Sequence, residues 1–219
     1  MNAHSRHATR SLFTTEARKG SSLCSLQFVG SVIVVIGFFG PWVTHRTAAL
    51  TLTGYELSEF AKFFPQVQGG VVPVTRALFV TPLLAGAISL ALIIHRSSAS
   101  ALLRLGAAAL TSLLCLMALP PFQSILDRGY RIQLVLIGGG VLLTLAAPLA
   151  RQLSERVRGL QLLFLTLVGA LPAFWQAILL RPLIADLYGS AVLPGWGFLS
   201  CGIGFFALLI TSLRSIIHR

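Results

Sequence analysis

One uncharged stretch decides the fold: Ala77–His95, ALFVTPLLAGAISLALIIH, in which 19 residues include no Asp, Glu, Lys or Arg. An α-helix rises about 1.5 Å per residue, so a helix of this length crosses most of a hydrocarbon layer about 30 Å thick. A surface helix of a soluble protein would carry a polar face, and this stretch has none. It therefore predicts a transmembrane helix.

Five further stretches of similar length also lack charged side chains, and each is rich in apolar residues. They are Gly20–His45, Leu105–Leu126, Ile132–Ala150, Gly159–Leu180 and Leu187–Leu213. Backbone polar groups find no water inside lipid, so spanning segments of this composition are expected to be helical. The sequence predicts an all-α, polytopic membrane protein built as a bundle of six transmembrane helices.

The composition of the whole chain agrees with this class. Of 219 residues, 55% are hydrophobic and only 11% are charged, and the mean hydropathy is +0.84. Soluble domains carry about 25% charged residues, so an ordinary soluble enzyme, a disordered chain and a secreted disulfide framework are excluded. We expect a basic tail over 1–26, a transmembrane domain over 27–213 with an outer loop at 44–76, and a C-terminal segment over 214–219.

The 17 Lys and Arg residues fall unequally on the two sides that six helices define. The larger set comprises Arg6, Arg10, Arg18, Lys19, Arg96, Arg104, Arg151, Arg156, Arg158, Arg214 and Arg219. The smaller set comprises Arg46, Lys62, Arg76, Arg128, Arg131 and Arg181. Lys and Arg concentrate on the cytoplasmic side of membrane proteins, so both termini are expected in the cytoplasm of a multi-pass protein of the cell (plasma or inner) membrane.

The basic residues on the cytoplasmic side also explain why a membrane protein has a net charge of +11. Basic residues on the cytoplasmic side lie against anionic headgroups, so the lipid bilayer is the expected partner and nucleic acid is not. The N-terminal segment Met1–Ser25 leaves two interpretations open, because it is rich in Ser and Arg and has Glu16 as its one acidic residue. It has the composition of a cytoplasmic tail and also that of an organellar transit peptide.

The outer loop, Thr44–Arg76, carries the clearest local signal. Thr53 and Glu56 have the spacing of a capping box, in which each side chain bonds the other residue's backbone N–H. The residues that follow place apolar side chains on one helical face: Leu57, Phe60, Ala61 and Phe64. We expect a short amphipathic helix at the outer membrane interface, preceded by an extended segment over Val43–Thr53.

Two short motifs of this region, Gly40-Pro-Trp-Val and Leu52-Thr-Gly-Tyr-Glu-Leu, resemble a pattern of small uncharacterised bacterial multi-pass membrane proteins. In those proteins a Pro-Trp ends the first helix, and a Ser/Thr-Gly-aromatic-acidic-Leu run follows in the outer loop. The resemblance covers about 20 residues and implies no activity. Two interpretations remain open: Trp42 is an interfacial anchor beside a simple helix start, or the loop docks a partner or caps a ligand.

The predicted helices carry no recognisable catalytic chemistry. Their cores hold no Asp, Glu, Lys or Arg, and the histidines do not share a helix at metal-ligand spacing. The sequence has no Cys-x-x-Cys, phosphate-binding loop or dinucleotide fingerprint. We therefore expect no catalytic residue, no metal site and no cofactor, and interpret the protein as non-enzymatic.

The remaining ligand-binding candidates are Gln176 and Trp175 in the fifth predicted helix. A buried amide needs a partner, so Gln176 is expected to join two helices or to face a ligand pocket. Gly138–Gly140 and the pair Gly202 and Gly204 are candidates for loosening the fourth and sixth helices, as helix breaks do in transporters.

Two functions are compatible with these features. The first is an accessory or assembly subunit of a membrane complex, with a membrane-protein partner or a second copy of the chain. The second is a small permease or a substrate-binding membrane component for a neutral or lipid-like ligand.

Overall fold

The computed structural model describes residues 23–45, 50–96, 100–125 and 127–217. Within them the chain is mostly helical, and four helical spans are long and apolar enough to cross a membrane. They are Arg76–Arg96, Arg128–Gln152, Glu155–Tyr188 and Trp196–Ile217. Two further apolar helices are shorter: Leu23–Phe39, which we call the N-terminal helix, and Ala101–Leu116.

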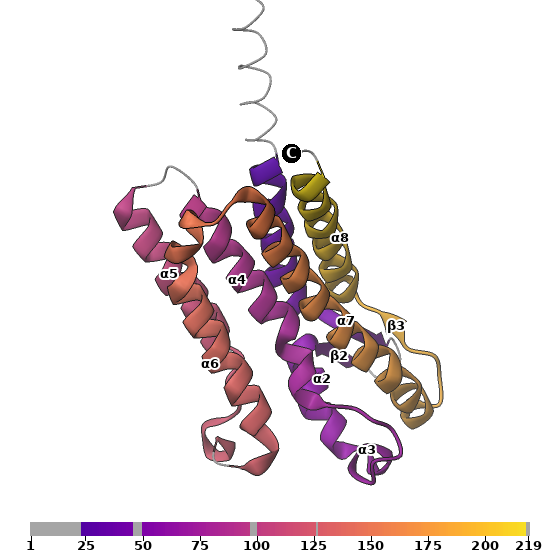
Figure 1. Ribbon diagram of the computed structural model, residues 1–219. Coiled ribbons are helices and arrows are strands. Elements are labelled where there is room, and N and C mark those ends of the chain that lie inside the picture. The colour runs from indigo at the N-terminus through magenta and orange to yellow at the C-terminus, as the bar shows by residue number, and fades with distance from the viewer. Residues whose placement is uncertain (1–22, 46–49, 97–99, 126, 218–219) are drawn as a thin grey trace, which may run out of the picture.

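The long helices stand side by side with α4 at the centre (Figure 1). They are α4 (Thr81–Arg96), α5 (Ala101–Leu116), α6 (Arg131–Ala146), α7 (Glu155–Tyr188) and α8 (Trp196–Ile217). Short 3-10 turns join them: η2 (Arg76–Val80), η3 (Phe122–Ser124), η4 (Arg128–Tyr130) and η5 (Ala147–Gln152). The α4 span has 83% of its apolar window buried by protein, whereas the α6 span has 28%.

A small sheet and two short helices cover one end of the bundle, which we call the cap end. They are β1 (Pro41–His45), β2 (Leu50–Thr53), β3 (Leu193–Pro194), α2 (Gly54–Phe60), η1 (Ala61–Phe63) and α3 (Pro65–Gln68). The strand order is β2-β1-β3 with both pairings antiparallel. The extended segment expected over Val43–Thr53 is therefore a pair of strands, and the third strand comes from the connection between α7 and α8.

The start of α2 has both hydrogen bonds of the capping box. Thr53 Oγ1 accepts from the N–H of Glu56 at 3.3 Å, and the Thr53 N–H donates to Glu56 Oε2 at 2.8 Å. Leu57 and Ala61 are fully buried, so the apolar face of this segment packs against protein. The cap end is thus specified by local sequence and fixed by packing on the bundle.

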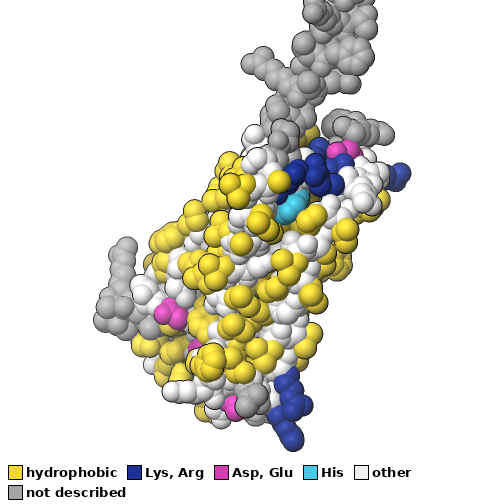
Figure 2. All heavy atoms as spheres, turned by 90° about the vertical axis from the view of Figure 1, so that its left-hand side faces the viewer, with side chains coloured by type: hydrophobic (Ala, Val, Ile, Leu, Met, Phe, Trp, Pro, Cys, Tyr) yellow, Lys and Arg dark blue, Asp and Glu magenta, His cyan; other side chains and the backbone are white. Residues whose placement is uncertain are grey.

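The opposite end we call the basic end, because Arg96, Arg104, Arg158 and Arg214 lie on the ends of α4, α5, α7 and α8 that meet there. Figure 2 shows Lys and Arg side chains gathered at this upper end of the molecule, above a hydrophobic flank. The N-terminal residues 1–22, which hold most of the predicted tail, lie outside the described residues.

The N-terminal helix contacts α8 through glycine. A Cβ atom at Gly204 would lie 2.7 Å from the carbonyl oxygen of Gly30, and one at Gly37 would lie 2.7 Å from the backbone nitrogen of Cys201. The Cys201 thiol donates to the carbonyl oxygen of Val34 at 3.3 Å. These small residues let two helices meet backbone to backbone, and we call this contact the glycine seam.

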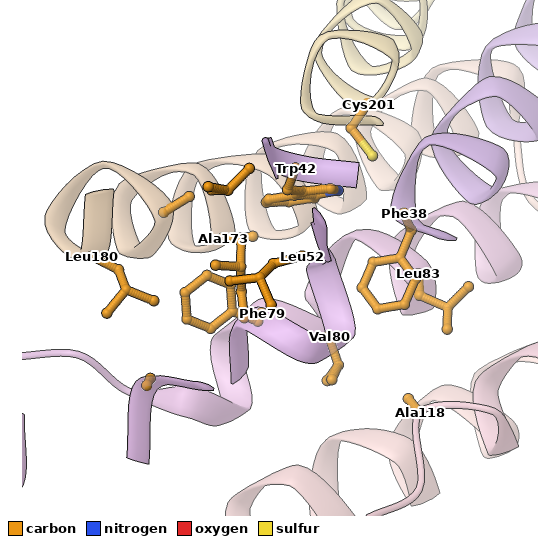
Figure 3. Close-up of a cluster of buried hydrophobic side chains, with 14 of the residues drawn as sticks. Phe38, Trp42, Leu52, Phe79, Val80, Leu83, Ala118, Ala173, Leu180 and Cys201 are labelled. Atoms are coloured by element: carbon orange, nitrogen blue, oxygen red, sulfur yellow. The ribbon is translucent and has the colours of Figure 1, made fainter. Parts of the chain in front are cut away.

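Several expectations need correction. The prediction that Trp42 anchors at a membrane interface is wrong, because the side chain is 1% exposed and lies in the core (Figure 3). Its ring stacks on Phe174 and meets Phe198 edge-on, and its indole N–H donates to the Gly37 carbonyl oxygen at 3.1 Å. The Pro-Trp pair at the end of the first predicted helix suggested an interfacial position, but side chains of α7 and α8 pack against the Trp42 ring.

The glycines expected to loosen helices do not break them. The helix α6 continues through Gly138–Gly140, and α8 continues through Gly202 and Gly204. Helical structure also extends beyond 27–213, since the first helix is already present at Leu23 and α8 continues to Ile217. These glycines therefore give no support to an unwound transport site.

Candidate functional site

The two predicted ligand residues, Gln176 and Trp175, are neighbours on α7 that face different surroundings. Gln176 is 5% exposed, and its Oε1 accepts from the backbone N–H of Thr75 at 2.9 Å. Trp175 is 59% exposed and lies on the outside of the bundle. The structure does not bring them into one pocket; Gln176 attaches the end of the outer loop to α7.

Other polar groups attach α2 and η1, at the cap end, to the connection between α5 and α6. The Tyr55 hydroxyl donates to the Leu119 carbonyl oxygen at 3.1 Å. The Tyr130 hydroxyl donates to Glu59, and the Lys62 ammonium bonds both of these groups. The ring of Tyr130 also contacts two cations, since the Lys62 ammonium and the Arg76 guanidinium are each 5.0 Å from its centroid.

Two pKa values at the cap end are shifted by this arrangement. Burial, followed by the charge of Glu59, raises the pKa of Tyr55 above 10.0. Burial opposes the charged form of Lys62, but hydrogen bonds to Glu59 and Tyr130 outweigh it, so the pKa of Lys62 is raised above 10.5. The ties at this end are therefore specific, and they fix the cap in place.

The basic end has a different character, because an open groove of about 910 Å³ lies between the N-terminal helix, α4 and α5. Its apolar lining includes Phe28, Val29, Ile93, Leu103 and Leu110. The volume lies within the range of ~300–1,000 Å³ that is common for small-molecule sites. We call this cavity the lateral groove.

Small residues of α5 create much of the space. Gly106 and Ala107 line the groove, and a Cβ atom at Gly106 would meet no atom within 4 Å. Ser100 also lines the groove, and its side chain caps α5 by accepting from the N–H of Leu103 at 3.3 Å. The walls are thus helices, and Gly106 contributes no side chain to the space between them.

A cluster of charged groups lies next to the groove. The Glu155 carboxylate binds two guanidinium groups, Arg96 and Arg158, each at 2.7 Å. A small cavity of about 20 Å³ is lined by both arginines together with Gln27 and Gln161. We call these five residues the arginine cluster.

Sequence reasoning missed both features. The groove is formed by residues from three separate helices, so no local spacing pattern predicts it. A usable signal existed only for the cluster, because Glu155 and Arg158 have the i, i+3 spacing of a helical ion pair. Among the described residues, no group of three or more His, Cys, Asp or Glu side chains is arranged to hold a metal ion.

Comparisons were made with protein-family models, with curated proteins and with solved structures, and none of them matches this chain.

Proposed function

We propose that this chain is a non-enzymatic membrane protein that binds the apolar part of a lipid-like ligand in the lateral groove. The observation that supports this proposal is the groove itself, which has a volume of about 910 Å³ and a largely apolar lining. Such a lining offers few polar partners for a water-soluble solute, whereas hydrocarbon gains contact along its whole length.

The proposal includes six transmembrane segments. The four long spans are joined by the N-terminal helix and α5, which are apolar and form two walls of the groove. At about 1.5 Å per residue these two helices are shorter than the hydrocarbon layer, so their flanking polar residues reach the headgroups. In this arrangement the groove opens toward the lipid, and a ligand enters from within the membrane.

The proposed orientation places the basic end in the cytoplasm of a cell-membrane protein, together with both termini. Support comes from the excess of Lys and Arg on that side. The cap end, with α2 at the outer interface, then lies on the opposite face, and the groove belongs to the cytoplasmic leaflet.

A second candidate function is that of an accessory subunit with a membrane-protein partner or a second copy of the chain. The observation that favours it is a set of apolar side chains on the cap-end connections. Phe63, Val71 and Phe122 are 75%, 77% and 93% exposed. A partner surface would cover them, although lipid at the outer interface would do the same.

The test uses native mass spectrometry of the full chain extracted gently from membranes. We expect bound lipid-like molecules on the wild-type protein and their loss in Gly106→Phe, which places an aromatic ring inside the groove. The matched control is Gly138→Phe, because Gly138 lies on α6 outside the groove and its Cβ would also meet no atom within 4 Å. Equal binding by all three proteins would contradict the proposal, and a stoichiometric protein partner would favour the second candidate.

A further inference from the structure

The arginine cluster contains more positive charge and more hydrogen-bond donors than its own contacts use. One carboxylate, Glu155, faces two guanidinium groups, so the three side chains have a net charge of +1. A guanidinium has five N–H donors, and the Nε of Arg158 is buried and has no hydrogen-bond partner. Leaving such a donor unpaired is destabilising, so an acceptor is expected nearby.

The small cavity of the cluster has room for that acceptor. Its volume of about 20 Å³ exceeds the ~10–15 Å³ that one water-sized group needs. Besides Arg158, it is lined by Gln161, whose buried Oε1 also has no partner. The site therefore combines an unpaired donor with an unpaired acceptor.

The cluster and the lateral groove share a wall. Ile93 of α4 lines both the small cavity and the groove, so the charged site and the apolar site are adjacent. The side chains of Arg96 and Arg158 are 29% and 21% exposed, so both can be reached from outside the bundle. An apolar groove beside a partly exposed cationic cluster matches an amphiphile with an anionic head.

The surroundings strengthen the positive potential. The basic end also holds four more described arginines: Arg104, Arg151, Arg156 and Arg214. Glu155 is the acidic residue that the described helices place at this end, and it is already bound to two arginines. A phosphate group is attracted here by charge and bound by guanidinium donors, which suit its geometry.

We propose that the ligand of the lateral groove is an anionic phospholipid, whose phosphate is bound by Arg96 and Arg158 while its acyl chains occupy the groove. This inference rests on the proposed function and adds the headgroup class to it. The unpaired Arg158 donor bonds a phosphate oxygen. The Gln161 amide bonds a headgroup hydroxyl through its oxygen.

The experiment titrates delipidated full-length protein in mild detergent with phosphatidylglycerol or with phosphatidylcholine of the same acyl chains, and counts bound lipid by native mass spectrometry. We expect phosphatidylglycerol to bind about tenfold more tightly, because its headgroup has hydroxyls for Gln161 and lacks the choline cation, which the arginine cluster repels. Arg158→Gln is expected to weaken the binding of both lipids, because both carry the phosphate, and to remove most of the preference for phosphatidylglycerol.

The matched control is Arg156→Gln, which removes the same charge from an exposed position outside the small cavity. It should retain the preference for phosphatidylglycerol. Arg158→Lys keeps the charge but lacks the Nε donor, so it should retain only part of the preference. Thermal unfolding of each variant shows whether it is folded, and Arg96→Gln provides a second variant that acts on the same phosphate.

The outcomes separate the two proposals. Equal binding of the two lipids by the wild-type protein, with both lost in Gly106→Phe, would overturn the anionic headgroup and leave the groove as a lipid site. Equal loss of preference in Arg156→Gln and Arg158→Gln would also overturn it, since general charge would then explain the selectivity. Lipid binding that survives Gly106→Phe unchanged would contradict the proposed function itself.

Discussion

The N-terminal helix faces α8 and α5 in two different ways. Toward α8 it forms the glycine seam, where Gly30 and Gly204 bring the backbones into contact. Toward α5 it leaves the lateral groove, although Gly106 on that wall is just as small. Glycine therefore allows close contact with α8 but leaves open space toward α5. The difference is that the backbone of α8 approaches the N-terminal helix.

This contrast has a functional meaning. A groove keeps its volume only if its walls do not collapse onto each other, because an unfilled apolar space loses packing contacts. The glycine seam holds the N-terminal helix on α8, and the polar ties of the cap hold the opposite end of the bundle. The glycine seam thus holds the N-terminal helix in the position that keeps the lateral groove open.

The largest effect is expected from breaking the glycine seam. Gly204→Leu forces a side chain against the carbonyl oxygen of Gly30, where even a Cβ atom would lie at 2.7 Å. We expect a loss of about 3 kcal/mol of stability, the upper part of the usual range for overpacking. Thermal unfolding in detergent measures it, and Gly138→Leu on the open face of α6 should be nearly neutral. Equal losses in both variants would refute the seam.

A smaller effect is expected from detaching the outer loop from α7. Gln176→Leu removes the acceptor of the Thr75 N–H, and an unpaired buried donor costs about 1–3 kcal/mol. Hydrogen exchange should show faster opening around Thr75, and lipid binding in the groove should persist. Trp175→Leu, at the exposed neighbour, is the control. Loss of lipid binding in Gln176→Leu alone would instead place a ligand at the amide.

The capping box should contribute less again. Thr53→Ala removes the oxygen that accepts from the Glu56 N–H, and the loss of such a cap typically costs about 1 kcal/mol. The expected result is a lower unfolding temperature together with local exchange confined to α2. Thr51→Ala on the exposed part of β2 serves as the control. An unchanged α2 would show that packing alone specifies this helix.

The smallest effect concerns alkaline pH. The folded protein raises the pKa of Lys62 above 10.5 and that of Tyr55 above 10.0, so it holds both protons more tightly than the unfolded chain. Stability from these groups is therefore present below about pH 10 and falls as pH rises further. Unfolding temperatures across this range should fall more for the wild type than for the double variant Lys62→Met, Tyr55→Phe.

Local features of the sequence predicted much of the molecule. The uncharged stretch Ala77–His95 lies within a helical span, and Thr53 and Glu56 form their capping box, because each signal is carried by residues close in the chain. The uncharged stretch Leu105–Leu126 likewise contains most of α5, which begins at Ala101.

Features that depend on tertiary packing were missed. Trp42 was interpreted as an interfacial residue, but α7 and α8 bury it. The strand β3 is too short to show a strand pattern in the sequence. The lateral groove has no sequence pattern at all, because it is the volume left between Phe28, Ile93 and Gly106 on three separate helices. The sequence also suggested a lipid-like ligand, with the candidate residues Gln176 and Trp175 on α7.

The most direct test of the lateral groove is photo-crosslinking in phosphatidylglycerol vesicles with a phospholipid analogue that carries a photoreactive group in its acyl chain. Peptide mapping then compares groove residues with Val135 and Leu142, which are 74% and 68% exposed on α6. We predict label concentrated on Phe28, Leu103 and Leu110 and reduced there by Gly106→Phe. Label spread equally over the groove and α6, and unchanged in that variant, would contradict a lipid-binding groove.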